Sequence, residues 1–186
     1  MDLKEIIKNF VPSNEQEEND RELMLNYISI FDDVLTRKNK MCHFTVSAWI
    51  TNSSRDKILM IYHNIYDSWS WIGGHCDGDD NLLNVALKEA KEETGLTDFK
   101  ILDNNITSLE ILTVEGHIKN EKYVSSHLHL NCTFLLEADE NKELKIKQDE
   151  NSGVKWFDIN EVLRITREKK MIPIYKKLNK KLLNLK

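Results

Sequence analysis

The chain has little cysteine, proline and glycine, and it has no long apolar run. Among its 186 residues are three Cys, two Pro and six Gly. Cys42, Cys76 and Cys132 are far apart and form no CxxC pair, which argues against a disulfide framework and a structural zinc site of cysteines. No signal peptide is recognisable, and no uninterrupted apolar stretch is long enough to cross a bilayer. We therefore expect a cytoplasmic protein with no membrane partner.

An excess of positive charge is also absent. The 31 acidic and 26 basic residues give a formal net charge of −5, which argues against DNA as a partner because nucleic-acid binding usually requires a basic surface. Basic residues are concentrated between residues 164 and 181. We interpret this segment as a solvated helix face, with attraction of a polyanionic substrate or RNA as the alternative.

The most informative stretch lies between Gly74 and Leu96. Glu89, Glu92 and Glu93 have spacings of three and four residues, which place their carboxylates on one face of a helix. Like charges this close repel, and such clusters persist where Mg²⁺ or Mn²⁺, which prefer oxygen ligands, offsets the repulsion. We therefore expect a site for Mg²⁺ or Mn²⁺. The alternative is an acidic, solvated helix face.

The same stretch resembles the motif of the Nudix hydrolases, G-x5-E-x7-R-E-U-x-E-E-x-G-U, in which U is a bulky apolar residue. Without a gap, the positions that match are Gly74, Glu89, Glu92, Glu93, Gly95 and Leu96. Asp80 replaces a Glu of the motif, Lys88 replaces its Arg, and Ala90 is small for an apolar position. Lysine cannot make the bidentate fork of arginine. Asp80 is either a ligand or a cap of the helix.

The resemblance implies an α/β fold, an α/β/α sandwich in which a mixed sheet lies between helices. Alternating apolar residues at 43–50 and 57–63 predict an antiparallel pair of strands, and further strand patterns follow Gly95. The first forty residues lack strand signals. We expect an N-terminal helical extension over residues 1–40 and a Nudix hydrolase domain with C-terminal helices over residues 41–186.

The N-terminal extension carries an acidic run and an apolar pattern of its own. Leu23, Tyr27, Ile30 and Phe31 have helical spacing and predict the helix face that packs on the domain. A contribution to substrate binding is the alternative role.

The resemblance assigns roles to the motif residues. Glu89, Glu92 and Glu93 are expected to hold the metal ions and to act in catalysis, and the backbone carbonyl of Gly73 is expected to be a further metal ligand. Gly73 and Gly74 have no side chains, so substrate phosphates could approach the backbone closely there.

Four further positions are candidate site residues. In Nudix sites an acid on a loop before the last strand is often present; Glu150 resembles it and is expected to bind metal or to act as general base, with Asp149 as its rival. His127 and His129 share the polar face of a predicted strand and are expected to contact phosphate or metal, unless they are surface residues. Lys88 is expected at the substrate site, where it would orient a neighbouring carboxylate.

The resemblance implies a divalent-metal-dependent hydrolase that cleaves a pyrophosphate bond in a nucleoside diphosphate linked to another moiety, or in a related nucleotide. One alternative is a Nudix domain that senses a nucleotide or phosphosugar without turnover. Another is an enzyme similar to isopentenyl diphosphate isomerase, although Cys76 is displaced from the cysteine position of those enzymes. The expected partner is a small nucleotide or diphosphate substrate, and a homodimer is left open. Candidates for stacking on a base are Tyr66, Trp69, Trp71 and Tyr123.

Overall fold

The computed structural model describes residues 2–119 and 121–185. Its helices are α1 (Leu3–Asn9), α2 (Glu15–Ile30), α3 (Leu82–Thr94), α4 (Val162–Ile165) and α5 (Ile172–Leu183), with the 3-10 helix η1 (Lys169–Met171) before α5. Its strands are β1 (Cys42–Thr51), β2 (Lys57–His63), β3 (Ser68–Ser70), β4 (Ile72–His75), β5 (Lys100–Ile101), β6 (Ser108–Val114), β7 (His117–Lys119), β8 (Lys122–Val124), β9 (His127–Glu137) and β10 (Asn151–Asp158). Within the described residues, no helix has the length and apolar character needed to cross a bilayer.

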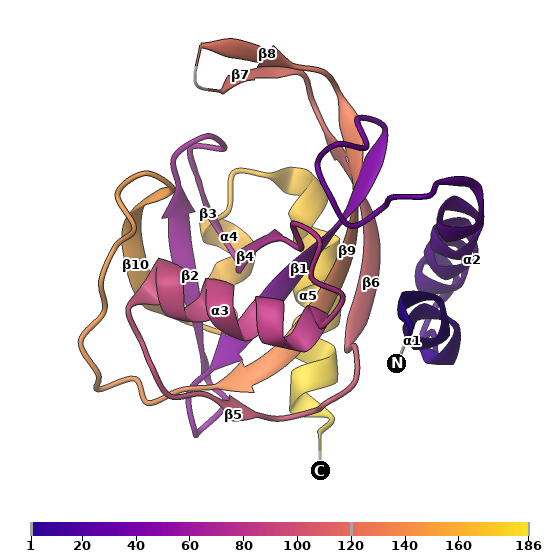
Figure 1. Cartoon of the computed structure of the whole chain (residues 1–186). Helices are drawn as coiled ribbons and strands as arrows, with labels where there is room; N and C mark the ends of the chain where they lie inside the picture. The colour runs from indigo at the N-terminus through magenta and orange to yellow at the C-terminus, as the bar shows by residue number, and fades with distance from the viewer. Residues whose placement is uncertain (1, 120, 186) are drawn as a thin grey trace.

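The sheet is built around β1 and β9, which run parallel and pair from Cys42 opposite Leu128 to Thr51 opposite Glu137. On the other edge of β1 lie the antiparallel strands β2 and β4, and β2 also pairs with β3 and β10. The outer edge of β9 pairs with β5 and β6. Strands β7 and β8 form a separate hairpin that projects beyond the sheet (Figure 1). The predicted mixed sheet is therefore confirmed.

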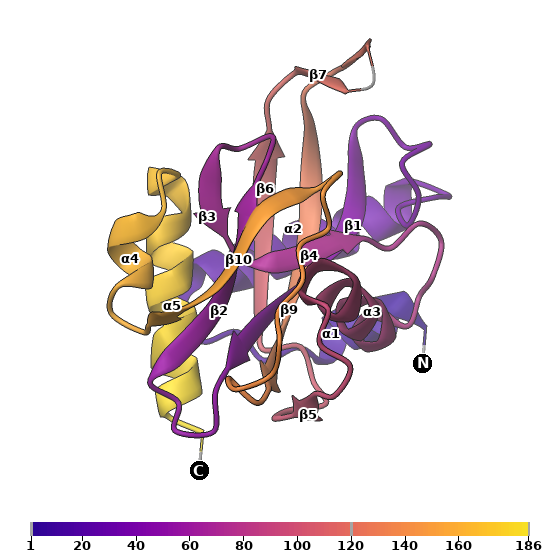
Figure 2. The same ribbon diagram turned by 90° about the vertical axis from the view of Figure 1, so that its left-hand side faces the viewer.

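Helices cover both faces of the sheet, as expected for an α/β/α sandwich (Figures 1 and 2). Phe44 and Val46 of β1 belong to a core that includes α1, α2 and the start of α3. Trp49 faces the opposite layer, where its ring stacks on Tyr175 of α5 at a centroid distance of 4.9 Å. Successive residues of β1 thus serve two cores, because side chains alternate between the faces of a strand.

The predicted packing face of α2 is confirmed at Tyr27 and Phe31, which pack against the core, and is wrong at Leu23 and Ile30. Met24 is fully buried, whereas Leu23 is 39% exposed and Ile30 is 70% exposed. Glu17, seven residues before Met24 and therefore on the same face of the helix, is also fully buried. The orientation of α2 is set by this buried carboxylate together with Met24, and apolar spacing alone could not reveal it.

Glu17 joins the N-terminal helices to the sheet and to α5. Its carboxylate accepts hydrogen bonds from Lys181 and from the Ser108 hydroxyl, which lies at 2.8 Å. Lys177 Nζ lies 3.1 Å from Glu17 and 2.9 Å from Glu110 of β6. The interpretation of the basic C-terminal segment as a solvated face is therefore wrong for Lys177 and Lys181, whose side chains are mostly buried in these ion pairs.

Replacing Glu17 tests how much this ion cluster stabilises the fold. Burial alone would raise the pKa of Glu17, but hydrogen bonds from Lys181, Ser13 and Ser108 and the charge of Lys177 outweigh it and lower the pKa from 4.5 to about 2. We expect Glu17→Gln to reduce the free energy of unfolding at neutral pH by about 3 kcal/mol, because Lys181 loses its counter-charge and Lys177 keeps only Glu110.

The same replacement should change the response to acid. Since the pKa of Glu17 is lower in the folded than in the unfolded state, its stabilisation is complete above pH 4.5 and is lost as the pH falls toward 2. Thermal melts across this range should show a steeper loss of Tm for the wild type than for Glu17→Gln. Glu18→Gln, an exposed change in the same helix, is the matched control and should melt like the wild type. Parallel pH profiles for wild type and Glu17→Gln would contradict the assignment.

Candidate metal centre and substrate cleft

The carboxylate helix α3 has defined ends. Asn81 is its N-cap, because its side-chain oxygen accepts a hydrogen bond from the Asn84 amide at 3.2 Å. Gly95 ends it with a positive φ of 74°, a conformation that glycine adopts without strain. Asp80 is exposed and lines a different cavity, beside α1. Asp80 is thus not the cap, and it does not line the cleft that contains the motif carboxylates.

The two glycines of β4 lie directly against α3. The Gly73 amide donates a hydrogen bond of 2.9 Å to the carboxylate of the buried Glu93. A Cβ atom on Gly74 would lie 2.4 Å from the carboxylate carbon of Glu89, and a Cβ atom on Gly73 would lie 2.3 Å from the Val46 carbonyl oxygen. Both positions require glycine, because a side chain would displace either a motif carboxylate or strand β1.

A fourth carboxylate and a lysine join the three glutamates of α3. Lys147 Nζ lies 2.9 Å from a carboxylate oxygen of Glu92 and 2.9 Å from one of Glu150. The exposed Lys88 is 3.8 Å from Glu92, an arrangement that contributes little in water. Lys147 was not among the residues predicted for the site. Its spacing of three residues from Glu150 was the available signal, but the pairing with Glu92 depends on how the loop before β10 folds over α3.

The four carboxylates of this site outnumber the two lysines, Lys88 and Lys147, that pair with them. The pKa of Glu93 is raised to about 8, chiefly by burial and also by the charges of Glu150 and Glu89, against the opposing effect of the Gly73 amide. Burial also raises the pKa of Glu89; the charge of Lys147 opposes this shift and that of Glu92 adds to it. A divalent cation would relieve the repulsion, and a donor set of carboxylate oxygens fits Mg²⁺ or Mn²⁺. Glu150 is coupled electrostatically to Glu93 and pairs with Lys147, while its rival Asp149 also lines the cleft, so Glu150 as the additional acid stays a prediction.

These carboxylates line one side of a cleft of about 430 Å³. Its floor is polar, since Asn131 of β9 accepts hydrogen bonds from the hydroxyls of Thr45 at 3.1 Å and Ser47 at 2.9 Å. Lys147 and Lys170 also line the cleft. The site therefore combines grouped carboxylates, neutral polar groups and cations, as binding of a metal with a phosphate chain requires.

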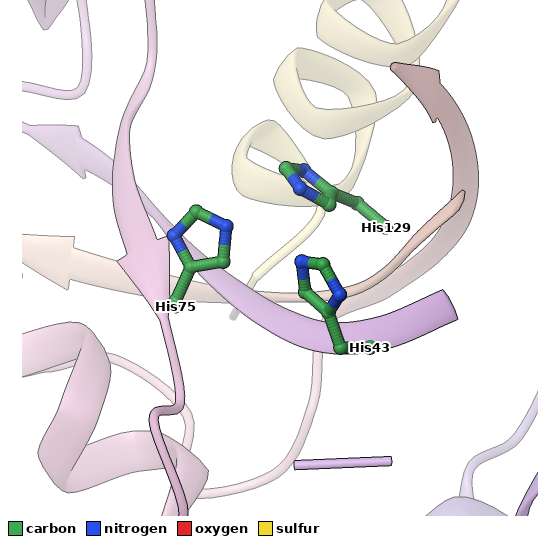
Figure 3. A group of neighbouring side chains, drawn as sticks. All are labelled: His43, His75 and His129. Carbon is green, nitrogen blue, oxygen red and sulfur yellow. The ribbon is translucent and has the colours of Figure 1, made fainter. Parts of the chain in front are cut away.

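Histidines form a further wall of the cleft. His75 and His129 line it, and their rings contact that of His43 with centroid distances of 5.1 Å and 5.0 Å (Figure 3). His127 Nε2 lies 3.2 Å from His129 Nε2. Burial, together with the neighbouring histidines, lowers the pKa of His129 to about 2, so its ring is neutral. His127 and His129 were predicted at the site from the sequence. His43 and His75 were not, because only the strand register brings them beside His129.

Cys76 does not belong to the site. It is buried in the core beside α3, and burial, with the nearby charges of Asp79, Asp77 and Glu89, raises the pKa of its thiol to about 12. A thiol without access to the cleft and without thiolate character at neutral pH cannot act as nucleophile. This finding argues against the isomerase-like alternative.

The structure thus brings most of the predicted site residues to one cleft, whose lining includes Gly73, Gly74, Lys88, Glu89, Glu92, Glu93, His129 and Glu150. Their roles as metal ligands, catalytic groups or substrate contacts stay predictions. The hydrogen bond at Gly73 comes from its amide; the predicted role of its carbonyl as a metal ligand is a separate expectation.

Comparison with known proteins agrees with this geometry. The family model of the NUDIX domain matches residues 41–178. The asymmetrical bis(5'-nucleosyl)-tetraphosphatase of Mus musculus is 25% identical over 122 residues, which are 64% of this chain and 76% of that protein. The corresponding protein of Rattus norvegicus is 21% identical over 123 residues.

Solved structures support the fold. A binary complex of a C. elegans Ap4A hydrolase aligns with a TM-score of 0.56 and 16% identity, covering 75% of this chain and 97% of that one. A Nudix hydrolase from M. smegmatis, RenU, aligns with a TM-score of 0.58 and 12% identity, covering 77% of this chain and 88% of that one. At these identities the likeness concerns the fold alone.

The two glycines provide a test that separates metal binding from folding. We expect Gly74→Ala to weaken Mn²⁺ binding roughly tenfold or more, because the new methyl group displaces the carboxylate of Glu89, while the flexible glutamate side chain lets the fold survive. Gly73→Ala should instead lower the free energy of unfolding by about 2 kcal/mol, because its methyl group meets the backbone of β1. Calorimetric titration with Mn²⁺ and thermal melts measure the two effects. Unchanged Mn²⁺ affinity in a folded Gly74→Ala protein would contradict the proposed ligand role of Glu89.

Proposed function

The chain belongs to the Nudix hydrolase family, and on this premise we propose that it hydrolyses a pyrophosphate bond in a nucleoside diphosphate derivative with Mg²⁺ or Mn²⁺ as cofactor. The observation that carries the proposal is the convergence of three α3 carboxylates and Glu150 beside the half-buried glycines Gly73 and Gly74, at the wall of a cleft.

Each of the four acids has a role in the proposed mechanism. Glu89, Glu92 and Glu93 would hold the cation, and the Gly73 amide fixes the carboxylate of Glu93 for this purpose. When bound, the cation supplies positive charge that neutralises the phosphates. A water oxygen forms a bond to phosphorus, the bridging P–O bond breaks, and the water proton passes to a carboxylate. Glu150, which lies outside the helix, is the candidate acceptor of this proton.

Cations and backbone groups of the cleft suit a phosphate chain. Lys147 lies between Glu92 and Glu150, and Lys170 enters the cleft from η1 while donating a hydrogen bond to the Thr113 carbonyl at 3.0 Å. The exposed Lys170 can act as a point charge toward phosphate, and the largely buried Lys147 adds a second positive charge, held between two carboxylates. This distribution supports an anionic substrate longer than a single phosphate.

Tyr66 is the best candidate for contact with a nucleoside base. It lies on the turn between β2 and β3, lines the cleft and is 41% exposed. Its ring stacks on His63 at a centroid distance of 4.3 Å. Trp71 also lines the cleft but is buried against Tyr175. We propose that Tyr66 offers its outer face to a base.

The names of the relatives suggest which substrates to test first. The mouse and rat proteins are tetraphosphatases of bis(5'-nucleosyl) compounds, and the cleft offers cations and an aromatic ring to such a molecule. A nucleotide-sensing domain without turnover is the second candidate. The complete set of motif carboxylates in α3 favours hydrolysis over sensing.

We also propose that residues 1–40 are a structural extension of a domain formed by residues 41–186. The support is that Ile7 and Met24 share one core with Leu82 and Phe134. The cytoplasm remains the expected compartment, and a homodimer remains an untested possibility for the assembly.

Turnover and its dependence on Glu93 test the proposed activity. With Mg²⁺, we expect the protein to hydrolyse at least one of dinucleoside polyphosphates, ADP-ribose, nucleotide sugars or nucleoside triphosphates, measured by chromatography of the products. Glu93→Gln should reduce kcat by roughly a thousandfold with little loss of Tm, because the group that would hold the cation becomes neutral. Glu143→Gln, an exposed change outside the cleft, is the control. Binding of these compounds without turnover would favour a sensor instead.

The proposed base contact predicts an effect on substrate affinity. Tyr66→Ala should raise KM roughly tenfold with a smaller change in kcat, because stacking of a base on an aromatic ring is worth about 1–3 kcal/mol. Tyr66→Phe keeps the ring and should retain the wild-type KM. Equal KM values for the alanine variant and the wild type, measured on the substrate found above, would refute stacking on Tyr66.

A further inference from the structure

Three strands bring three imidazole rings to one point, and none of the three is a motif position assigned to the metal. His43 lies on β1, His75 on β4 and His129 on β9. The register places His43 beside His129, and Thr45, two residues from His43, beside His75. One ring nitrogen from each histidine lies within 4.8 Å of the others, and the rings face a common space (Figure 3).

His43 carries an unpaired acceptor into this space. Its Nδ1 lies 3.1 Å from the Asn39 carbonyl, which can only accept, so Nδ1 carries the proton and Nε2 carries a lone pair. The side chain is 3% exposed, and Nε2 has no hydrogen-bond partner among the described residues. A buried polar atom without a partner costs free energy. A metal ion would satisfy this lone pair, and metal-binding histidines characteristically donate their second N–H to such a carbonyl.

The tautomer of His129 is fixed in a similar way, by a hydrogen bond to His127. The Nδ1 of His127 lies 2.8 Å from the Ser125 carbonyl, so in the neutral ring Nδ1 donates and Nε2 accepts. That Nε2 lies 3.2 Å from His129 Nε2, which therefore donates to it. The Nδ1 of His129 is left with its lone pair. Two successive hydrogen bonds thus fix the tautomer of His129 as one that can bind a metal.

We propose that His43, His75 and His129 form a binding site for a transition-metal ion of the Zn²⁺ type, with His127 as a positioning residue. Imidazole nitrogens suit Zn²⁺ and related ions, whereas Mg²⁺ prefers oxygen, so this site is chemically distinct from the carboxylate cluster. Binding would draw the three nitrogens together to roughly 3.4 Å, the separation in a tetrahedral zinc site. His75 and His129 line the cleft, so a fourth coordination position would be open to a phosphate or water.

The test measures metal binding directly and does not depend on the proposed hydrolase activity. Protein without a polyhistidine tag is stripped with chelator, dialysed against Zn²⁺ and analysed for metal content, and Co²⁺ is used as a spectroscopic probe. We expect one tightly held Zn²⁺ per chain and the visible absorption bands of four-coordinate Co²⁺. His75→Ala, a change of a half-buried residue, should weaken Zn²⁺ binding at least a hundredfold and abolish the Co²⁺ bands. His127→Ala should weaken it roughly tenfold to a hundredfold, as loss of a supporting hydrogen bond does.

Two control variants distinguish Zn²⁺ binding at the three histidines from Zn²⁺ binding elsewhere on the protein. His63→Ala removes a histidine outside the cluster and should bind Zn²⁺ like the wild type. Glu93→Gln should also keep the tight Zn²⁺, because it alters the carboxylate cluster alone. Circular dichroism verifies folding, and His43→Ala is a further test where it folds. Zn²⁺ binding that survives His75→Ala or disappears in Glu93→Gln would overturn the proposal, and so would a wild-type protein that retains no Zn²⁺.

Discussion

The close approach of α3 to β4 is the constraint on which the rest of the site depends. The Gly73 amide reaches the buried carboxylate of Glu93 at 2.9 Å, and the Cα of Gly74 lies against the carboxylate of Glu89. A helix that carries acids on its inner face can dock this closely only where the strand beneath it has no side chains. The same contact buries Glu93 and raises its pKa. The packing therefore makes the ionised carboxylates unfavourable on their own, and a bound divalent cation would offset that cost.

The parallel pairing of β1 with β9 organises the opposite part of the cleft. It places Asn131 between the hydroxyls of Thr45 and Ser47, and it places His43 beside His129. Polar side chains therefore follow one face of two central strands, a position that apolar residues usually occupy. Polar groups in this position cost free energy if left alone. Asn131 is satisfied by Thr45 and Ser47, whereas Nε2 of His43 has no partner among the described residues. The sheet thus supplies a binding floor without losing its packing on the other face.

A buried ion cluster holds the outer elements to this framework. Glu17 of α2 and Glu110 of β6 bind Lys177 and Lys181 of α5. The helix α5 follows directly after η1, which carries Lys170 into the cleft. The charges that fasten the N-terminal helices to the domain therefore also fix the end of the chain that lines the cleft. Buried ion pairs of this kind hold the elements together because separating them would leave an unpaired charge in the core, which is costly.

Local spacing in the sequence was sufficient to predict the α3 carboxylates, its terminal glycine and the alternating strands, because helical and strand periodicity depend on near neighbours. It also indicated the α/β/α class through a family motif. The tertiary structure alone decided that Lys147 lies at the carboxylates, that His43 and His75 lie beside His129, and that Glu17 is buried. Each of these residues gains its partner from a strand or helix distant in the chain, and no local pattern records which distant segments will pair. A charged or imidazole side chain is the same chemical group whether it is exposed to solvent or buried in a cluster. Only the folded chain determines which of these environments surrounds it.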